Sequence, residues 1–490
     1  MEEEIFVNVT ESGSRIVVTE QGLLREIYTE RAHFRSTIGN IYKGKVTRVL
    51  PAIDGAFIDI GNERDAFIQG KDVLPPSALI FEKKYVDHKS DPIGNLLYRG
   101  QELLVQVTKD PINKKTHRVT ANIALVSRNL VYKPYSSELT ISPRIEEPKE
   151  RLRLKEALVL VAKNKGGFIV RTAAENIDES SLSRDIQLLQ ERWLKIVERS
   201  KRVSSPNAVY AEPSLPLRVI RDIVSVRTSR IVVDTQETKH EFFNFLAEFM
   251  PSKLDVLELS SSTDLIFDNH DLEDQINLAI EQRVVLRSGG YLIIEQTEAM
   301  TTIDVNTGMS VRPKDARGTI LKTNLEAAAS IPWELRLRNM GGIIVIDFID
   351  MEDEEDKRQV FRTLEEAQKS HRVKSDFSYF SELGLVELVR KRNSESLVRT
   401  LCEPCKCCRG RGFVKTVETV CSEIMNEIHR RAGLYKKACL VKASELVVNK
   451  LLEEKSNSIF HLSEAMGLEI RLQAESSYKQ ENFDVIEVLN

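Results

Sequence analysis

The spacing of apolar and polar residues predicts a small β-barrel near the start of the chain. From about residue 36 to residue 124, short stretches in which apolar and polar residues alternate are separated by Gly and Pro. This pattern is typical of the strands of a compact all-β unit. The expected strands are residues 41–50, 55–61, 65–70, 105–109 and 118–121.

The second half of the chain has a different pattern, in which strand-like and helix-like segments alternate. Such alternation predicts an α/β unit. Asp271 is expected to cap a helix that runs to about Leu286, and Pro332 to kink or break the helical stretch 316–339. Further strands are expected at 220–226, 230–234 and 343–346, helices at 146–163, 238–249, 352–371 and 417–431, and strands again after residue 453.

Side chains with oxygen ligands end two of the strands predicted in this α/β unit. Asp304 and Asn306 end the first, and they project to one face because they lie two residues apart on an extended chain. Asp347 and Asp350 follow the second, whose apolar run predicts a fully buried strand. Two such strand ends side by side would suit magnesium and phosphate chemistry. A pair of hydrogen-bonded structural aspartates is the alternative.

Composition narrows the class of protein. The 490 residues are enough for several domains, and 41% hydrophobic with 29% charged residues is typical of globular proteins. The acidic amino terminus does not resemble a signal peptide, and no apolar run approaches the roughly 20 residues of a membrane span. The net charge of −4 argues against uniform wrapping by nucleic acid, although residues 390–415 carry eight Lys or Arg against two Glu. We therefore expect a cytoplasmic enzyme or binding protein.

Four of the six cysteines lie within seven residues: Cys402, Cys405, Cys407 and Cys408. The Cys-x-x-Cys spacing followed by Gly-rich residues resembles half of a zinc knuckle, and structural zinc usually takes four ligands. No second Cys or His pair lies nearby at the usual spacing. Either the four local thiols close one site, or two chains contribute two thiols each. A reactive or redox cluster is the alternative.

Two further sets of residues indicate contacts with nucleic acid or phosphate. Phe57 and Phe67 lie in predicted barrel strands near several lysines, a mixture on which single-stranded nucleic acid stacks, and core phenylalanines are the alternative. Arg171 and Thr172 end a strand and could present a guanidinium and a hydroxyl to phosphate, with a surface salt bridge as the alternative. The lysines are Lys109, Lys114 and Lys115.

Six blocks of the sequence resemble the bacterial ribonuclease E/G family. They occur in the family's order over nearly the whole chain, and several exceed ten residues. The run 415–421 and the end of the chain at residue 490, without a long disordered extension, resemble the G branch of that family. The blocks are residues 39–45, 56–61, 166–175, 289–308, 335–351 and 408–421.

The resemblance implies an α/β multidomain fold. An RNase H-like domain is expected in two parts, residues 1–35 and 217–279. An OB-fold RNA-binding domain (36–125) and a 5′-phosphate sensor (126–216) would be inserted between them. A deoxyribonuclease I-like catalytic subdomain (280–400), a zinc link (401–413) and a small α+β C-terminal domain (414–490) would follow.

The resemblance also implies roles for individual residues. Asp304 and Asp347 match the family's magnesium-binding aspartates, with Asn306 as their hydrogen-bonding companion, and Asp350 is then expected to be structural or to lie just outside the metal ligands. The RNA-contacting residues would be Phe57, Phe67 and Lys115, the 5′-monophosphate site Arg171 and Thr172 with Val131 beside them, and the zinc ligands Cys405 and Cys408. Glu382 stands where the E branch has an arginine near the sensor, which puts the strength of 5′-end sensing in doubt.

The function implied is that of a cytoplasmic, magnesium-dependent endoribonuclease acting on single-stranded RNA in rRNA processing and mRNA decay. It would favour a 5′-monophosphate and leave 5′-phosphate and 3′-hydroxyl ends. Structural zinc would be shared in a homodimer or a dimer of dimers. One alternative is a non-catalytic RNA-binding scaffold dimerised through zinc, which the retained Asp304, Asn306 and Asp347 disfavour. Another is a deoxyribonuclease, which the RNA-binding type of the barrel disfavours.

Overall fold

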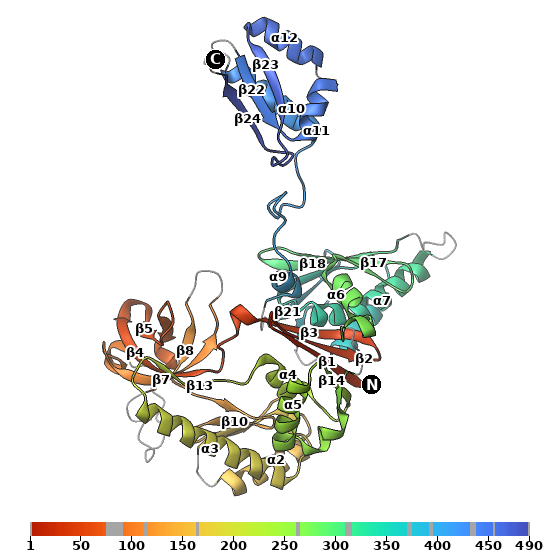
Figure 1. Cartoon of the computed structure of the whole chain (residues 1–490). Helices are drawn as coiled ribbons and strands as arrows, with labels where there is room; N and C mark the ends of the chain where they lie inside the picture. The colour runs from red at the N-terminus through yellow and green to blue at the C-terminus, as the bar shows by residue number, and fades with distance from the viewer. Residues whose placement is uncertain are drawn as a thin grey trace. The chain divides into compact units, whose positions relative to one another are not determined.

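The computed structural model of the chain describes residues 2–74, 92–111, 116–162, 166–260, 265–308, 316–369, 375–391, 395–431, 438–453 and 456–488. The chain divides into two compact units, Met1–Thr400 and Leu401–Asn490, and each is described by itself (Figure 1). Lys114 and Lys115 lie outside the described residues. None of the described helices is long and apolar enough to cross a membrane.

The first strands of the chain share a sheet with strands that follow residue 227. β1 pairs parallel with β14 and antiparallel with β2, which gives the order β15-β14-β1-β2-β3. Alternate residues such as Ile5, Val7 and Val233 are buried against the helices that pack on this sheet. The elements are β1 (Glu3–Thr10), β2 (Gly13–Glu20), β3 (Leu23–Arg31), β14 (Thr228–Val233), β15 (Leu257–Leu259), α4 (Leu215–Ile223), α5 (Gln236–Phe249) and α6 (Leu272–Ile280).

Two sequence predictions fail in this part of the chain. The strand expected at 220–226 is wrong, because α4 occupies most of it. Val219, Ile220 and Ile223 are buried together at helical spacing, and a proline at the start of α4 favours the first helical turn. The helix after Asp271 is shorter than expected, since α6 ends at Ile280 and a strand begins three residues later. Asp271 itself is left-handed and makes no side-chain cap.

The predicted barrel is confirmed as a closed, OB-like barrel of five strands. β4, β5, β6, β8 and β7 pair in that order, the additional pairing of β4 with β7 closes the ring, and β13 joins at the edge of β4. Closure leaves the barrel strands paired on both sides and fills the interior with apolar residues such as Val46, Ile58 and Ile68. The elements are β4 (Ile41–Leu50), β5 (Gly55–Asp59), β6 (Ala66–Gln69), α1 (Ile93–Leu96), β7 (Glu102–Lys109), β8 (Arg118–Thr120) and β13 (Asn207–Tyr210).

A four-stranded sheet follows the barrel, in the order β11-β12-β10-β9, and two long helices pack beside it (Figure 1). The helix expected at 146–163 is confirmed as α2. The second helix, α3, begins where the carboxylate of Asp178 accepts a hydrogen bond from the amide of Ser181, which satisfies one of the free amides of the first turn. The elements are β9 (Leu125–Val126), β10 (Leu130–Lys133), β11 (Leu139–Ile141), α2 (Pro148–Ala162), β12 (Gly167–Val170) and α3 (Glu179–Arg202).

The α/β unit of the second half is a six-stranded sheet with α7 and α8 packed on one face. Its order is β16-β17-β18-β19-β21-β20, and β18 and β19 are parallel. The side chains that face the helices are apolar and buried, including Ile303, Ile344 and Ile346. The elements are β16 (Arg283–Val285), β17 (Tyr291–Gln296), β18 (Met300–Asn306), α7 (Ala316–Leu337), β19 (Gly342–Asp347), α8 (Glu354–Lys369), β20 (Ser375–Phe377), β21 (Leu385–Arg390) and α9 (Leu397–Leu401).

Two expectations are corrected here. The strand predicted to be fully buried is buried on one face only: Ile344 and Ile346 are inaccessible, whereas Ile343 is 50% exposed because the helices cover a single face. Pro332 does not break its helix, since α7 runs unbroken through it. Its ring is buried next to Ile331, and tertiary packing outweighs the loss of one backbone hydrogen bond.

The second unit contains a three-stranded sheet, β23-β22-β24, with helices packed against it. β22 pairs parallel with β23 and antiparallel with β24. The expectation that only strands follow residue 453 is wrong, because α12 intervenes. The elements are α10 (Val417–Arg431), β22 (Ala438–Ala443), α11 (Glu445–Glu453), α12 (Ser456–Met466), β23 (Glu469–Ala474) and β24 (Phe483–Glu487).

Candidate active site

Asp304 and Asp347 are direct neighbours on the two central strands of the six-stranded sheet. β18 and β19 run parallel, and their register pairs Asp304 with Asp347. Adjacent strands lie about 4.8 Å apart, so two carboxylates in register on one face are held close together. Both side chains are exposed on the face that α7 and α8 leave open. The sheet therefore brings together the two aspartates that the sequence placed at separate strand ends.

The third predicted residue of this site holds one of the aspartates in place. Asn306 donates a hydrogen bond from Nδ2 to Oδ2 of Asp304 at 2.8 Å. Burial and the negative charges of Asp304 and then Asp350 raise the pKa of Asp347. Neither Asp304 nor Asp347 forms an ion pair with a Lys or Arg of the described residues. Within the described residues, the site thus gathers negative charge that no ion pair offsets.

The open face carries two further side chains that sequence reasoning missed. The register of β16, β17 and β18 aligns Arg283 with Ile293 and Ile293 with Asp304, while Tyr291 is aligned with Asn306. The Arg283 guanidinium lies 4.1 Å from the centre of the Tyr291 ring. A cation over an aromatic ring beside two carboxylates would suit a phosphate with an attached base. Only the strand pairing reveals this arrangement of Arg283 and Tyr291, because the sequence predicts a helix through the residues of β16.

A buried amide on α7 fixes the backbone just beyond Asp347. Asn324 is inaccessible; its Nδ2 donates to the carbonyl of Ile349 at 2.8 Å, and its Oδ1 accepts from the Ile349 amide at 3.1 Å. A polar side chain buried in an apolar helix interface is costly unless fully hydrogen-bonded, and here both ends are. Asn324 therefore sets the path of the chain where β19 ends.

We expect Asn324→Ala to lower the free energy of unfolding by about 2–3 kcal/mol, because it leaves the half-buried Ile349 amide and carbonyl without their hydrogen-bond partner. Urea denaturation followed by circular dichroism would measure the change. Lys322→Ala is the matched control, since Lys322 is exposed on the same helix and should change stability by less than about 0.5 kcal/mol. Equal losses for the two variants would contradict this role.

Phe57 and Phe67 form an aromatic pair on the surface of the barrel rather than in its core. They are cross-strand neighbours on β5 and β6, half-buried, with ring centres 5.6 Å apart at 66°. A Cβ at Gly55 would lie 2.3 Å from the Phe67 ring, so glycine there lets the ring cover β5. The core alternative is wrong for both residues, and Lys115 is outside the described residues.

Arg171 and Thr172 follow β12 and lie beside the residues that lead into β10. The Nη1 atom of Arg171 donates to the carbonyl of Ser127 at 2.7 Å and to Oδ1 of Asp222 at 2.8 Å. The ion pair that sequence reasoning weighed as the alternative is therefore present. The hydroxyl of Thr172 lies 3.1 Å from that of Ser142.

The environment of Asp222 is what holds Arg171. Burial alone would raise the pKa of Asp222, but hydrogen bonds from Arg221 and the charges of Arg221 and Arg171 outweigh it, so the pKa lies below the usual value. The carboxylate stays ionised and fixes Arg171. Val131, on β10, is half-buried and paired with Ile169 of β12, the strand that leads to Arg171.

The four clustered cysteines are free, and two of them differ from the others in their contacts. Hydrogen bonds from the backbone of Cys408 and then Cys407, and from the Cys408 side chain, lower the pKa of the Cys405 thiol. The Sγ of Cys408 accepts a hydrogen bond from the amide of Gly412 at 3.4 Å. Amides directed at sulfur favour a thiolate, the form that binds metal. In the described part of the chain, no three His, Cys, Asp or Glu side chains gather closely enough to hold a metal.

Comparison with known proteins finds relatives over almost the whole chain. The family model described as Ribonuclease E/G family matches residues 124–393, and one described as RNase E/G, Thioredoxin-like domain matches residues 404–488. The protein named Ribonuclease G of Escherichia coli (strain K12) is 44% identical over 487 residues, which cover 99% of this chain and 100% of the relative. Ribonuclease G of Haemophilus influenzae is 43% identical over 485 residues, 99% of each chain. Ribonuclease E of a Synechocystis species is 36% identical over 382 residues, 77% of this chain and 55% of the relative.

Proposed function

The chain belongs to the ribonuclease E/G family and is an endoribonuclease, and we propose that it cleaves single-stranded RNA on the open sheet face that carries Asp304 and Asp347. The observation that supports this most directly is the register of β18 and β19, which places the two carboxylates side by side with Asn306 bonded to one of them. Cleavage would leave a 5′-phosphate and a 3′-hydroxyl. Processing of rRNA and decay of mRNA in the cytoplasm are the roles we propose for it.

Magnesium fits the donors of this site. Mg²⁺ is commonly bound through one or two carboxylates and completes its shell with water and substrate phosphate. Asp304 and Asp347 supply two carboxylates that form no ion pair with a Lys or Arg of the described residues, and burial together with the charges of Asp304 and Asp350 raises the pKa of Asp347. When bound, Mg²⁺ supplies Lewis acidity to the scissile phosphodiester and its attacking water. Asn306 keeps Asp304 oriented, and Asp350 adds negative charge from beyond the two ligands.

The barrel is proposed as the RNA-binding domain, of the OB-fold type. Phe57 and Phe67 offer two half-buried rings on which bases can stack, and the cross-strand row continues to Arg118 on β8. Lys115 is proposed to contact the RNA backbone beside them. The five-stranded sheet would belong to the RNase H-like domain (1–35 and 217–279), whose two parts flank the inserted domains in the sequence. The six-stranded sheet would belong to the deoxyribonuclease I-like subdomain (280–400).

Arg171 and Thr172, with Val131, are proposed to recognise a 5′-monophosphate within the sensor (126–216). The Nη1 atom of Arg171 is held by Ser127 and Asp222, whereas Nε and Nη2 make no hydrogen bond to another described residue. That edge of the guanidinium has two parallel donors, the geometry that binds phosphate bidentately. The ion pair with Asp222 therefore supports the sensor proposal, because it fixes the arginine without using the donors that phosphate needs.

Arg171→Lys should reduce the preference for a 5′-monophosphate over a 5′-hydroxyl by about tenfold, since lysine keeps the charge but loses one charge-assisted hydrogen bond of about 1.5 kcal/mol. We expect Asp222→Asn to give a smaller loss, because the guanidinium is then less firmly held. The ratio of kcat/KM for two oligonucleotides that differ only at the 5′ end measures both effects. Arg202→Lys on α3 is the control. A variant at Arg171 that slows both substrates equally would count against sensing.

The zinc link (401–413) is proposed to bind zinc through Cys405 and Cys408, with two chains completing a tetrahedral site in a homodimer or dimer of dimers. The backbone hydrogen bonds that stabilise a thiolate are directed at these two cysteines. The residues that follow belong to a small C-terminal domain whose family model is described as thioredoxin-like. The two cysteines within that domain, Cys421 and Cys439, are buried.

The function is tested by incubating the full-length protein with matched RNA and DNA oligonucleotides over a magnesium titration. We expect the rate of RNA cleavage to rise in proportion to the occupancy of the proposed metal site by magnesium. Single-stranded DNA should be cut much more slowly, and neither substrate should be cut without magnesium. Binding of RNA without cleavage at any magnesium concentration would instead support a non-catalytic scaffold dimerised through zinc. Equal cleavage of DNA would overturn the choice of RNA as substrate.

A further inference from the structure

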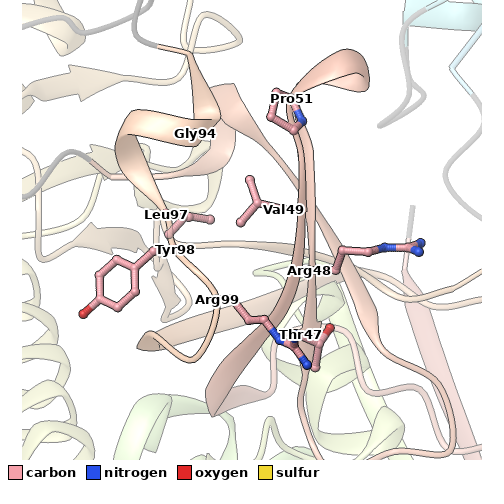
Figure 2. A pocket seen from close by; sticks show the side chains of 8 residues that line it. All are labelled: Thr47, Arg48, Val49, Pro51, Gly94, Leu97, Tyr98 and Arg99. Atoms are coloured by element: carbon pink, nitrogen blue, oxygen red, sulfur yellow. The ribbon is translucent and has the colours of Figure 1, made fainter.

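The barrel has a hollow that the proposed RNA contacts at Phe57 and Phe67 do not use. It is an open hollow of about 560 Å³. Val49, Pro51 and Leu97 supply apolar atoms, while Tyr98 and Arg99 lie on the loop beside them (Figure 2). No acidic side chain lines it among the described residues. The remaining lining residues are Thr47, Arg48 and Gly94.

The loop that bears Tyr98 and Arg99 is held firmly against β4. Leu97 is buried in the barrel core, and the Gly100 amide donates to the carbonyl of Val46 at 2.8 Å. The Val46 amide in turn donates to the carbonyl of Gln101 at 2.9 Å. With the backbone fixed on both sides, the two side chains between these anchors are presented to solvent without further ordering of the chain.

Tyr98 and Arg99 present an exposed ring and an exposed positive charge to a ligand. The Tyr98 side chain is 69% exposed, and its hydroxyl makes no hydrogen bond within the described residues. Arg99 is exposed, and it forms no ion pair with any acidic residue that the structure describes. An exposed tyrosine next to an unpaired arginine, at an apolar floor, has the complementarity of a nucleotide: a flat base and a phosphate.

Arg48 connects this hollow to the aromatic pair. It is the register partner of Phe57 on the neighbouring strand, and its guanidinium lies 5.2 Å from the centre of the Phe57 ring. Figure 2 shows Arg48 leaving β4 on the side away from Val49, so one residue lines the edge of the hollow and reaches the aromatic pair. The cross-strand row of Phe67, Phe57 and Arg48 therefore ends on β4, the strand whose next residue, Val49, lines the hollow.

We propose that this hollow is a second nucleotide-binding subsite for single-stranded RNA. Its base would stack on the exposed Tyr98 ring at the edge of the hollow, and its phosphate would meet Arg99 (Figure 2). The inference rests on the proposed function, since it takes the strand that stacks on Phe57 and Phe67 to be RNA. It extends the binding surface of the barrel by one nucleotide beyond Phe57, across β4.

The test is the affinity of the full-length protein for a ten-nucleotide RNA, measured by fluorescence anisotropy without added divalent metal. Tyr98→Ala should weaken binding about 5- to 150-fold, the usual range for removing one stacking platform, while Tyr98→Phe should bind like the wild type. Arg99→Ala should lower the slope of log Kd against log salt by about 0.7, the value for one phosphate contact on a single strand, and Tyr98→Ala should leave that slope unchanged. Phe460→Ala, an exposed aromatic of the second unit, is the control for surface truncation.

Scanning the RNA with a single abasic nucleotide assigns the contact to a base. One position should weaken binding to the wild type and have no further effect on Tyr98→Ala, because the two changes remove the same interaction. If Phe57→Ala weakens binding while Tyr98→Ala and Arg99→Ala bind like the wild type, the second subsite is refuted and the proposed function stands. Loss with Arg99→Ala but no abasic position coupled to Tyr98 overturns the subsite as well, since that result describes a bare phosphate contact. If the wild type binds no RNA, the proposed function fails.

Discussion

Asp347→Asn should reduce cleavage of a 5′-monophosphorylated RNA oligonucleotide by about 10³-fold or more, because an amide replaces one of the two carboxylates proposed to hold magnesium, whose contribution is several kcal/mol. Asp304→Asn should cause a loss of similar size, since the two residues are paired in register on one sheet face. The measurement is kcat/KM over a magnesium titration that extends well above the wild-type requirement.

The same substitution provides its own control for folding. A carboxyl whose pKa is raised on folding destabilises the folded state once the pH exceeds the pKa that it has in the unfolded chain. Asp347 is such a group, because burial and the charges of Asp304 and Asp350 raise its pKa. At neutral pH the metal-free Asp347→Asn protein should therefore melt no lower than the wild type. A loss of activity together with an unchanged or higher Tm assigns the effect to the site and excludes misfolding.

Asp350→Asn is the matched control for charge at this end of the sheet. Asp350 lies three residues beyond Asp347 and is exposed, but it is past the end of β19 and outside the register that pairs the two ligands. We expect its replacement to change kcat/KM by less than about tenfold, as for a residue that acts only through charge at a distance. Full cleavage by Asp347→Asn in excess magnesium, or a loss with Asp350→Asn as large as that with Asp347→Asn, would refute the assignment of the ligands.

The two strands that carry Asp304 and Asp347 were predictable because the information lies in short stretches of sequence. An apolar run followed by an acidic residue predicts a strand end, and a spacing of two places Asp304 and Asn306 on one face without any knowledge of distant contacts. The barrel is similar, since its alternating strands and turn residues are local signals. The pairing of Asp304 with Asp347 depends instead on the order of the sheet, which local pattern leaves open.

The failures occur where tertiary contacts decide the outcome. Over the seven residues 220–226, the apolar pattern is as consistent with a strand as with a helix. Packing against the neighbouring sheet selects the helix. Ile343 looked buried because the sequence does not say that the sheet is covered on one face alone. The roles of Asn324 and Asp222 were missed for the same reason: each acts on a residue 25 or more positions away.

Cys405→Ser and Cys408→Ser should each abolish zinc binding and convert the assembly to monomers, since a shared site loses two of its four ligands when both chains carry the change. Cys402→Ser and Cys407→Ser should retain both zinc and assembly, because the backbone hydrogen bonds that favour a thiolate are directed at Cys405 and Cys408. Metal analysis together with native mass spectrometry measures zinc per chain and the number of chains in one experiment.

The stoichiometry separates the shared site from its alternatives. Half a zinc per chain in a dimer is the expected result, because two Cys from each of two chains complete one tetrahedron. One zinc per chain in a monomer would mean that the four local thiols close a site within one chain. A redox cluster would bind no zinc, would lose accessible thiols on mild oxidation and would recover them with a reductant. Since Cys402, Cys405 and Cys407 are all exposed, exposure cannot identify the ligands, and hydrogen bonding to sulfur is the property that distinguishes the pair.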